Sequence, residues 1–450
     1  MTTSHTLRLA DAAPPGLPAA PRTLEETGLS YSLLLELVVK TLFLHGELRL
    51  ADLVQAIALP PGVLTPLLGL MRSERLCEVT RRGDTDGRTS YSLTETGRAR
   101  ADDFLRRSQY VGVAPVGLQD YVAQVERQSV ARMGVSQERL QRVFEGVVVS
   151  DGLLGQLGAA MNSNRPIFIY GPSGSGKTFL AERLAGALSG AVAVPHALAV
   201  GSEVIRVFDP LVHRPLPAPP GTAFDRGAAG DARWALCRRP VVMSGAELTL
   251  AMVDLEFDTQ TRFYHAPQQL KANNGLFVID DLGRQIVPAQ SLMNRWIVPL
   301  DRRTDFLTLH TGQKFELPFD VVVVFSSNMA PAQLGDEAFL RRLGYKIFVG
   351  PVGTDEYRAI TEQVCRALHV PFDAAGFAHL LGRHKAERRP LLACQPRDLL
   401  GQVRDYAVFN GVPPQMAPEL LDWAWNNYFA PQDHAPRAAA PTARPTGDVT

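Results

Sequence analysis

Residues 166–178 decide the fold, and they read Pro166-Ile167-Phe168-Ile169-Tyr170-Gly171-Pro172-Ser173-Gly174-Ser175-Gly176-Lys177-Thr178. The stretch begins with an apolar run of strand length and continues into a glycine-rich loop. Leu180, Leu184 and Leu188 then recur at helical spacing until Gly190. A buried strand that passes through a glycine loop into a helix is a unit of a parallel α/β sheet, so the sequence predicts an α/β core.

The loop and the start of the helix fit the GxxxxGK[ST] pattern of a phosphate-binding P-loop. Glycines suit this task because backbone N–H groups must wrap a phosphate without side chains in the way, and the positive end of the next helix adds attraction. We expect Lys177 to reach the β- and γ-phosphates of ATP and Thr178 to offer its hydroxyl to Mg²⁺. A glycine-rich loop without a ligand is the alternative. The predicted nucleotide-binding residues of this loop are Gly171, Pro172, Ser173, Gly174, Ser175, Gly176, Lys177 and Thr178.

Two more apolar runs of strand length end in polar residues. Leu276–Ile279 is followed by Asp280 and Asp281, and residues 321–325 are followed by Ser326, Ser327 and Asn328. The first pattern is a Walker B motif, in which Asp280 would hold Mg²⁺ and Asp281 would polarise the attacking water. Asn328 could orient the same water from the opposite side. A buried parallel strand with a polar end is the alternative for each run taken alone.

With these motifs in place, residues 150–430 resemble the AAA+ ATPases. The resemblance implies that Asn328 is the sensor-1 residue and that the box Asp336-Glu337-Ala338-Phe339-Leu340-Arg341-Arg342 places an arginine finger in a neighbouring subunit. Arg342 is the first candidate for the finger and Arg341 the second. Gln395-Pro396-Arg397-Asp398-Leu399-Leu400 looks like sensor 2, with Arg397 on the γ-phosphate, and helical patterns between Tyr357 and Tyr428 fit the helical lid of the family.

Within that superfamily the chain is most similar to MoxR-like ATPases and their relatives with an insertion around the second core helix, which are often described as having chaperone activity. Lys177 and Asp280 are 103 residues apart, more than a minimal core needs, and residues 306–318 read as a hairpin before the sensor-1 strand. One position departs from the family, because most members have Glu where this chain has Asp281. The shorter side chain predicts slow hydrolysis.

Residues 23–110 carry the pattern of three helices and a hairpin, which resembles a winged helix-turn-helix. DNA binding is one interpretation, and a module that contacts proteins is the other. The region has 11 Lys and Arg against 12 Asp and Glu, and the helix expected in a DNA groove, residues 63–72, offers almost no side chains for bases. Only Arg81, Arg82 and Arg88 are placed for phosphates, so we favour the protein-contact module.

The predicted organisation is a disordered segment (1–22), a winged-helix-like domain (23–110), a helical linker (111–150), the AAA+ core (151–350), a helical lid (351–430) and a disordered tail (431–450). Lys and Arg balance Asp and Glu at 46 each, which argues against a polybasic nucleic-acid or membrane-surface protein. We expect a cytoplasmic protein without membrane insertion and with reduced cysteines. The four cysteines, which have no metal-site spacing, are Cys77, Cys237, Cys365 and Cys394.

The function expected from these features is ATP hydrolysis with Mg²⁺ as cofactor, in a homo-oligomeric ring, most simply a hexamer, that remodels a protein partner. The lid and the N-terminal module are expected to move with the nucleotide state. Two alternatives stay open: an ATPase or regulator that reads DNA through the winged helix, and a slow nucleotide switch that mainly binds ATP and ADP.

Overall fold

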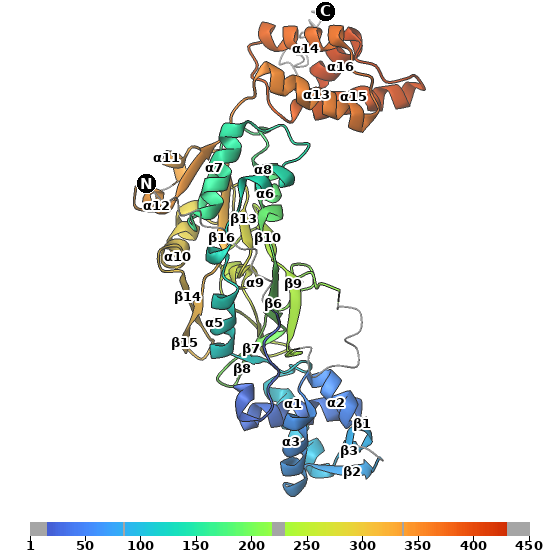
Figure 1. Ribbon diagram of the computed structural model, residues 1–450, viewed down its shortest axis with the longest axis vertical. Coiled ribbons are helices and arrows are strands. Elements are labelled where there is room, and N and C mark those ends of the chain that lie inside the picture. The colour runs from blue at the N-terminus through green and yellow to red at the C-terminus, as the bar shows by residue number, and fades with distance from the viewer. Residues whose placement is uncertain (1–15, 84–85, 218–229, 335–336, 430–450) are drawn as a thin grey trace, which may run out of the picture. The chain divides into compact units, whose positions relative to one another are not determined.

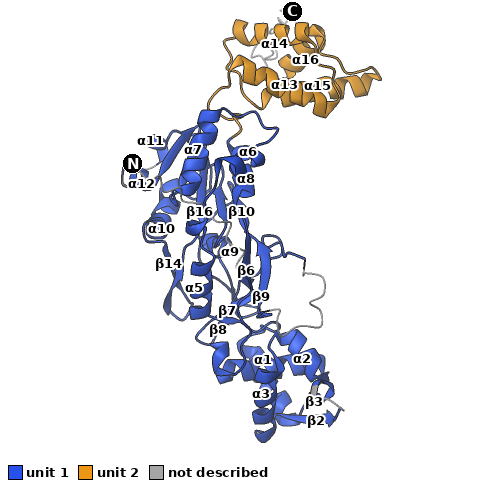
Figure 2. Cartoon of the chain, viewed as in Figure 1, with its two compact units in different colours: residues 1–171, 177–349 blue, residues 172–176, 350–450 orange. Residues whose placement is uncertain are grey.

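The computed structural model describes residues 16–83, 86–217, 230–334 and 337–429, which form two compact units (Figures 1 and 2). Unit 1 holds residues 1–171 and 177–349, and unit 2 holds residues 172–176 and 350–450. The mixed α/β fold with a parallel sheet, predicted from the sequence, is confirmed. The stretch 166–178 contains a strand of this sheet, the glycine-rich loop and the start of the next helix.

A five-stranded parallel sheet forms the centre of unit 1 (Figure 1). The strand order is β10-β13-β16-β5-β17, and every neighbouring pair is parallel. The apolar runs at β5, β13 and β16 are fully buried because helices cover both faces of such a sheet. The strand bounds are β5 (Ile167–Tyr170), β10 (Val241–Ser244), β13 (Leu276–Ile279), β16 (Val322–Ser327) and β17 (Tyr345–Phe348).

Alternation along the strands divides the core into two layers. Ile167 and Ile169 face one layer with helices α7 (Asp151–Asn162) and α8 (Lys177–Leu184), while Phe168 faces the other. That second layer is covered by α10 (Ala289–Arg302) and α12 (Glu337–Arg342). From β5 the chain first runs to the β10 edge, returns through β13 and β16, and then crosses to β17. The strand order therefore reverses at β5, and ligands of such sheets bind at the carboxyl ends of strands beside this point.

The chain between α8 and β13 carries most of the extra structure of unit 1. Four of its strands join β4, which precedes α8, in a second five-stranded sheet of order β11-β12-β8-β7-β4, and two more form the separate antiparallel pair β6-β9. The strand bounds are β4 (Val116–Gly117), β6 (Ala191–Pro195), β7 (Ala197–Val200), β8 (Glu203–Arg206), β9 (Trp234–Arg238), β11 (Glu256–Asp258) and β12 (Phe263–His265). Strand β4 belongs to the predicted helical linker, which therefore contains a strand besides α5 (Leu118–Arg127) and α6 (Gln137–Val143).

The hairpin predicted at residues 306–318 is confirmed. Strands β14 (Thr304–Thr308) and β15 (Lys314–Pro318) pair antiparallel directly before β16. The cysteines are free, as expected: Cys77, Cys237 and Cys365 are buried, and Cys394 is half-buried. No single described helix is long and apolar enough to cross a membrane, although the bent pair α2 (Leu50–Ile57) and α3 (Pro61–Ser73) of the N-terminal module would together meet the criterion of length and composition.

The N-terminal module combines four helices with a three-stranded antiparallel sheet of order β1-β3-β2. Part of the predicted hairpin turn, residues 84–85, lies outside the described residues. The winged-helix assignment stays a prediction. The elements are α1 (Tyr31–His45), β1 (Leu48–Arg49), α2 (Leu50–Ile57), α3 (Pro61–Ser73), β2 (Cys77–Arg81), β3 (Ser90–Leu93) and α4 (Glu95–Arg107).

Helix α3 is the helix that a DNA-binding interpretation would place in the groove. Its large apolar side chains, including Val63, Leu67 and Met71, are buried in the module. The side that faces solvent contains Thr65, Pro66, Gly69, Leu70 and a single cation, Arg72. A surface with so little positive charge and so few side chains for base edges does not suit DNA.

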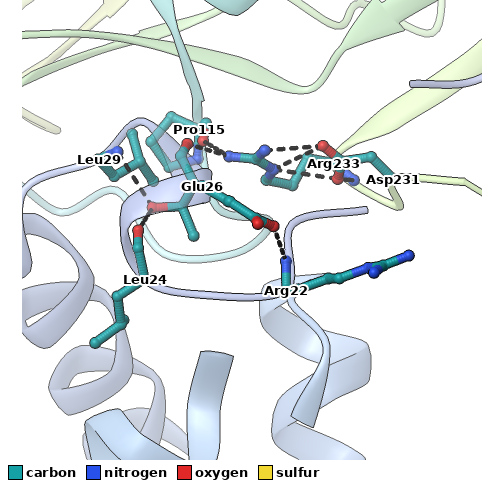
Figure 3. Close-up of polar contacts among 8 residues, drawn as sticks. Arg22, Leu24, Glu26, Leu29, Pro115, Asp231 and Arg233 are labelled. Atoms are coloured by element: carbon teal, nitrogen blue, oxygen red, sulfur yellow. Dashed lines mark hydrogen bonds and ion pairs between the residues drawn. The ribbon is translucent and has the colours of Figure 1, made fainter. Parts of the chain in front are cut away.

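A buried ion pair ties the N-terminal module to the rest of unit 1 (Figure 3). Arg233 binds Asp231 through two nitrogens and donates to the carbonyl oxygens of Thr27 (2.8 Å) and Pro115 (3.3 Å). Both side chains of the pair are at most 3% exposed. Breaking such a pair is costly, so these contacts oppose the expected independent movement of the N-terminal module.

The disorder predicted for residues 1–22 does not extend over residues 16–22. The Pro18 carbonyl accepts a hydrogen bond from the Asp231 N–H (2.7 Å), and Leu17 packs against the core of the second sheet. Apolar contacts at Leu17 and Pro21 offset the ordering entropy of this short segment. Residues 1–15 and the predicted tail 431–450 lie outside the described residues.

In its described residues, unit 2 contains four helices around a core with Tyr357 and Trp425 among its buried side chains. They are α13 (Thr354–Leu368), α14 (Ala374–Ala386), α15 (Gln395–Asn410) and α16 (Pro418–Phe429). Loop residues 172–176 belong to this unit, because the Cys394 N–H donates to the Gly174 carbonyl (3.1 Å).

Candidate phosphate-binding site

The glycine loop between β5 and α8 has the backbone that its sequence predicted. Gly171, Gly174 and Gly176 have φ angles of 151°, 82° and 96°, which side chains rarely tolerate. Helix α8 begins at Lys177, so its free N–H groups and positive end face the loop. The loop starts beside β16, since the Gly171 N–H donates to the Ser327 carbonyl (3.3 Å).

Two side chains at the start of α8 contact the ends of the neighbouring strands. The Lys177 ammonium donates to Asn328 Oδ1 (2.7 Å), directly after β16. The Thr178 hydroxyl donates to Asp280 Oδ2 (2.8 Å), directly after β13. Four residues that the sequence placed on three separate segments therefore meet at one edge of the sheet, because all three strands are parallel.

Asp281 joins this group through Asn328. The Asn328 amide donates to Asp281 Oδ1 (3.0 Å), so one asparagine links the lysine and the second acid. Asp281 has a φ of 50°, in the left-handed region that Asp and Asn tolerate better than other side chains. This conformation gives a physical reason for Asp where the resemblance predicts Glu.

The charges at the site are close enough to influence one another. Burial lowers the pKa of the Lys177 ammonium from its ordinary value, whereas the Asp281 and Asp280 carboxylates favour its charged form. Arg284, on the turn after Asp281, opposes these carboxylates and lowers the pKa of Lys177 further. The site thus has two carboxylates and two cations that are close enough to interact.

Two buried oxygen atoms at the site have no hydrogen-bond partner among the described residues: Asp280 Oδ1 and Ser175 Oγ. Buried polar atoms normally have partners, so these two fit a bound group. A carboxylate beside a threonine hydroxyl is a donor set that Mg²⁺ accepts together with phosphate oxygens. No group of three or more His, Cys, Asp or Glu suited to a metal ion occurs in the described part of the chain, this site included.

Gln285 supports the site and was missed in the sequence. Its amide accepts from the Gly283 N–H (2.8 Å) and donates to the carbonyls of Asp280 (3.0 Å) and Gly245 (3.2 Å). The Ser327 hydroxyl holds the same turn by donating to the Leu282 carbonyl (2.6 Å). Glutamine five residues after Asp280 has no sequence signal, since its partner Gly245 directly follows β10, a strand that the sequence did not reveal.

The structure does not bring Arg341 and Arg342 to Lys177. Both arginines end α12 just before the amino end of β17, whereas Lys177 follows the carboxyl end of the parallel strand β5. Arg342 Nε pairs with Asp301 Oδ2 (2.7 Å), and Arg341 pairs with Glu337 (2.7 Å) at the surface. Asp336 of the predicted box lies outside the described residues.

Arg397 lies in unit 2, exposed in the first turn of α15. The residue before that helix, Cys394, contacts the glycine loop: a Cβ atom on Gly174 would lie 2.4 Å from the Cys394 sulfur. The start of the helix that bears Arg397 is therefore fastened to loop residues 172–176 within unit 2.

Comparison with known proteins gives one family and several distant folds. Residues 353–427, most of unit 2 but less than half of the chain, match a family described as a domain of unknown function (DUF8689). No curated protein matches the sequence.

Solved structures with a similar fold include NtrX from Brucella abortus in complex with ADP, with 14% identity and a TM-score of 0.40 over 72% of this chain and 65% of that one. The match thus spans less than two thirds of the NtrX chain. The Holliday junction branch migration motor RuvB from Thermotoga maritima is similar at 12% identity and a TM-score of 0.35, over 67% of this chain and 72% of that one. Because these TM-scores lie below 0.5, the function of this chain must rest on its own residues.

Proposed function

We propose that this protein is an AAA+ ATPase that binds ATP with Mg²⁺ at the glycine loop and hydrolyses it. The observation that carries the proposal is the convergence of Lys177, Thr178, Asp280, Asp281 and Asn328, from three segments, at the carboxyl edge of the sheet beside its topological switch point. The orphaned oxygen of Asp280 supports a bound ligand at this edge of unit 1.

Each residue has a role that follows from its chemistry. The loop N–H groups and the start of α8 bind phosphate oxygens, and Lys177 exchanges its bond to Asn328 for the β- and γ-phosphates. Thr178 and Asp280 would hold Mg²⁺, which when bound neutralises charge on the phosphate oxygens. Asp281 accepts the proton of the attacking water, and Asn328 orients both the carboxylate and the water.

The arginines at the end of α12 support a site shared between subunits. They lie at the amino edge of the sheet, whereas the glycine loop follows the carboxyl end of β5. Within one chain they therefore cannot reach the phosphates of a nucleotide bound by that loop. A second copy that presents its carboxyl edge to them would allow Arg342, or else Arg341, to act as a finger in trans. This arrangement favours a ring of identical subunits, with a hexamer as the simplest size, and Arg397 of unit 2 would contact the γ-phosphate as sensor 2.

The large insertion favours the MoxR-like type with chaperone-like remodelling of a protein partner. Between α8 and β13, where that type has its insertion, the described residues contain six strands besides β10, four of them in the second sheet. The weakly charged solvent side of α3 supports a protein-contact role for the N-terminal module over DNA binding. The partner of such a module would be a protein in the same cytoplasmic compartment.

Phosphate release by the purified full chain with ATP and Mg²⁺ tests the proposal. We expect turnover that requires Lys177, because Lys177→Ala removes a charge-assisted contact of about 1.5 to 3 kcal/mol to the phosphates. Lys314→Ala, which removes an exposed lysine from β15, serves as the matched control and should keep both ATP affinity and turnover.

The outcomes separate the proposed function from its rivals. Unchanged ATP affinity in Lys177→Ala would refute the assignment of the loop. Tight ATP binding by wild type without turnover would leave a nucleotide switch in place of an ATPase. Turnover that rises with duplex DNA would favour the DNA-associated alternative, whereas stimulation by a protein fraction and not by DNA is the expected result.

A further inference from the structure

A surface cavity of about 670 Å³ lies in unit 1 where the segment before β5 meets the ends of α10 and α12. Four arginines line it, Arg165, Arg303, Arg341 and Arg342, together with the single acid Asp301. The lining therefore carries an excess of three positive charges. Guanidinium groups gathered in a concave surface recognise phosphate oxygens well, because each presents a planar set of donors that never loses its charge.

The four arginines differ in what they do in the cavity wall. Arg303 has a structural role, because it donates to the carbonyls of Val321 (2.9 Å) and Asn164 (2.7 Å). Arg342 is paired with Asp301, and Arg341 with Glu337. Arg165 differs from these three, because its side chain contacts the backbone of the helix that bears the two candidate fingers.

Arg165 holds the end of α12. Its Nη2 donates to the Arg341 carbonyl (3.2 Å), at the last turn of that helix. Its aliphatic stem packs over Gly344, where an added Cβ would lie 2.4 Å from Arg165 Cβ. Next to it the Pro166 carbonyl accepts from the N–H groups of Gly344 (3.1 Å) and Tyr345 (3.3 Å). The stretch 341–345 is thus fastened to residues 165–166.

We propose that Arg165 is a positioning residue for the Arg341–Arg342 pair, which under the proposed function serves a nucleotide bound by a second copy of this chain. The inference rests on the proposed function. Arg165 sets where the end of α12 lies, and its charge adds to that of the cavity. A displacement of about 1 Å at a reacting centre can cost about 10²-fold in rate, so loss of this contact should lower turnover without affecting the site in its own subunit.

The test compares Arg165→Ala, Arg165→Lys and the control Arg142→Ala, which removes an exposed arginine from α6. We expect Arg165→Ala to bind ATP with wild-type affinity and to lose at least about tenfold in kcat, which is a smaller loss than that of an arginine finger itself. Arg165→Lys, which keeps a charged donor, should recover part of the rate. Arg142→Ala should behave as wild type, and melting temperatures of all variants establish that they fold.

Mixing subunits identifies a role in trans. Arg165→Ala subunits retain an intact glycine loop, and Lys177→Ala subunits retain an intact arginine cavity. Mixtures should therefore show higher turnover than either variant alone, whereas a defect confined to the fold of the mutated subunit would not be rescued.

Wild-type turnover in Arg165→Ala, or a loss that mixing does not rescue, would overturn the inference while leaving the proposed ATPase intact. Absence of turnover in the wild-type chain would instead overturn the proposed function, and this inference with it. Recovery in mixtures of Arg342→Ala but not of Arg165→Ala would assign the finger without the positioning role and would also overturn it.

Discussion

Replacing Asp281 by Glu and by Asn separates side-chain reach from backbone conformation at the proposed catalytic position. If only the distance from the carboxylate to the attacking water mattered, Glu, the commoner residue in the family that the sequence resembles, would raise turnover. The structure predicts the opposite, because Asp281 has a φ of 50° and accepts the Asn328 amide hydrogen at 3.0 Å. Both features suit a short side chain on a left-handed residue.

The magnitude follows from the cost of the left-handed region. A longer side chain lacks the local hydrogen bonding that favours Asp and Asn there, and the left-handed conformation costs about 1 to 2 kcal/mol per residue. That free energy corresponds to roughly 5- to 30-fold fewer molecules with the turn correctly formed, so Asp281→Glu should lose turnover by about that factor. Asp281→Asn keeps the conformation but cannot accept a proton, and it should lose roughly 10²- to 10⁴-fold.

The assay is steady-state phosphate release per subunit at saturating ATP and Mg²⁺, with ATP affinity measured separately. Both variants should bind ATP, and the expected order of turnover is wild type, then Glu, then Asn. A slightly lower melting temperature for Glu than for Asn would report the backbone strain independently of chemistry.

Two results would refute this reasoning at different points. Turnover of Asp281→Glu equal to or above wild type would show that the left-handed backbone does not limit the site. Turnover of Asp281→Asn equal to wild type would remove Asp281 from the chemistry altogether.

Three further predictions concern stability and the loop. His213 is 1% exposed, accepts from the Asp209 N–H at Nδ1 and contacts the Lys271 carbonyl through Nε2, and burial lowers its pKa to about 4. The unfolded chain therefore takes up this proton first, and stability should fall by ~3 kcal/mol as the pH drops from about 6.5 to 4. Urea unfolding at several pH values should show a smaller fall in His213→Gln, and an identical slope would contradict the prediction. Arg233→Ala leaves Asp231 buried and unpaired and should lower the free energy of unfolding of unit 1 by about 3 to 5 kcal/mol, whereas Arg81→Ala, in an exposed pair with Glu47, should lower it by less than about 1 kcal/mol. Gly174→Ala combines a φ of 82° with a Cβ only 2.4 Å from the Cys394 sulfur, so its ATP affinity should fall well below that of the control Gly152→Ala, an exposed position of α7 with open space for a Cβ, and equal affinities would refute the packing of this loop.

The parts of the site that could be predicted are those whose signal is local in sequence. Strands β5, β13 and β16 lie in the middle of the sheet and are buried on both faces, so they read as uninterrupted apolar runs. Parallel strands bring their carboxyl ends to one edge, and the residues after each run therefore had to meet. For the same reason the positions of Lys177, Asp280 and Asn328 followed from the order of residues alone.

The two edge strands could not be predicted in this way. Strand β10 alternates between buried and more exposed residues, with Met243 40% exposed, and β17 carries Lys346 and the half-exposed Phe348. An edge strand has solvent along one side and only four residues here, so neither its length nor its hydrophobicity distinguishes it from a loop. Strand β4, with two residues, forms only because β7 lies beside it.

The sequence by itself determined the α/β class, the glycine loop, the acidic pair and the helices of unit 2, because each depends on residues close together in the chain. Tertiary structure alone decided the left-handed backbone of Asp281, the placement of Gln285 and the buried pair of Asp231 and Arg233. Arg233 donates to Thr27, 206 residues earlier, and Arg165 donates to Arg341, 176 residues later. Such contacts depend on how the whole chain packs, since an arginine reads the same in the sequence whether it pairs in the core, holds a helix end or faces a phosphate.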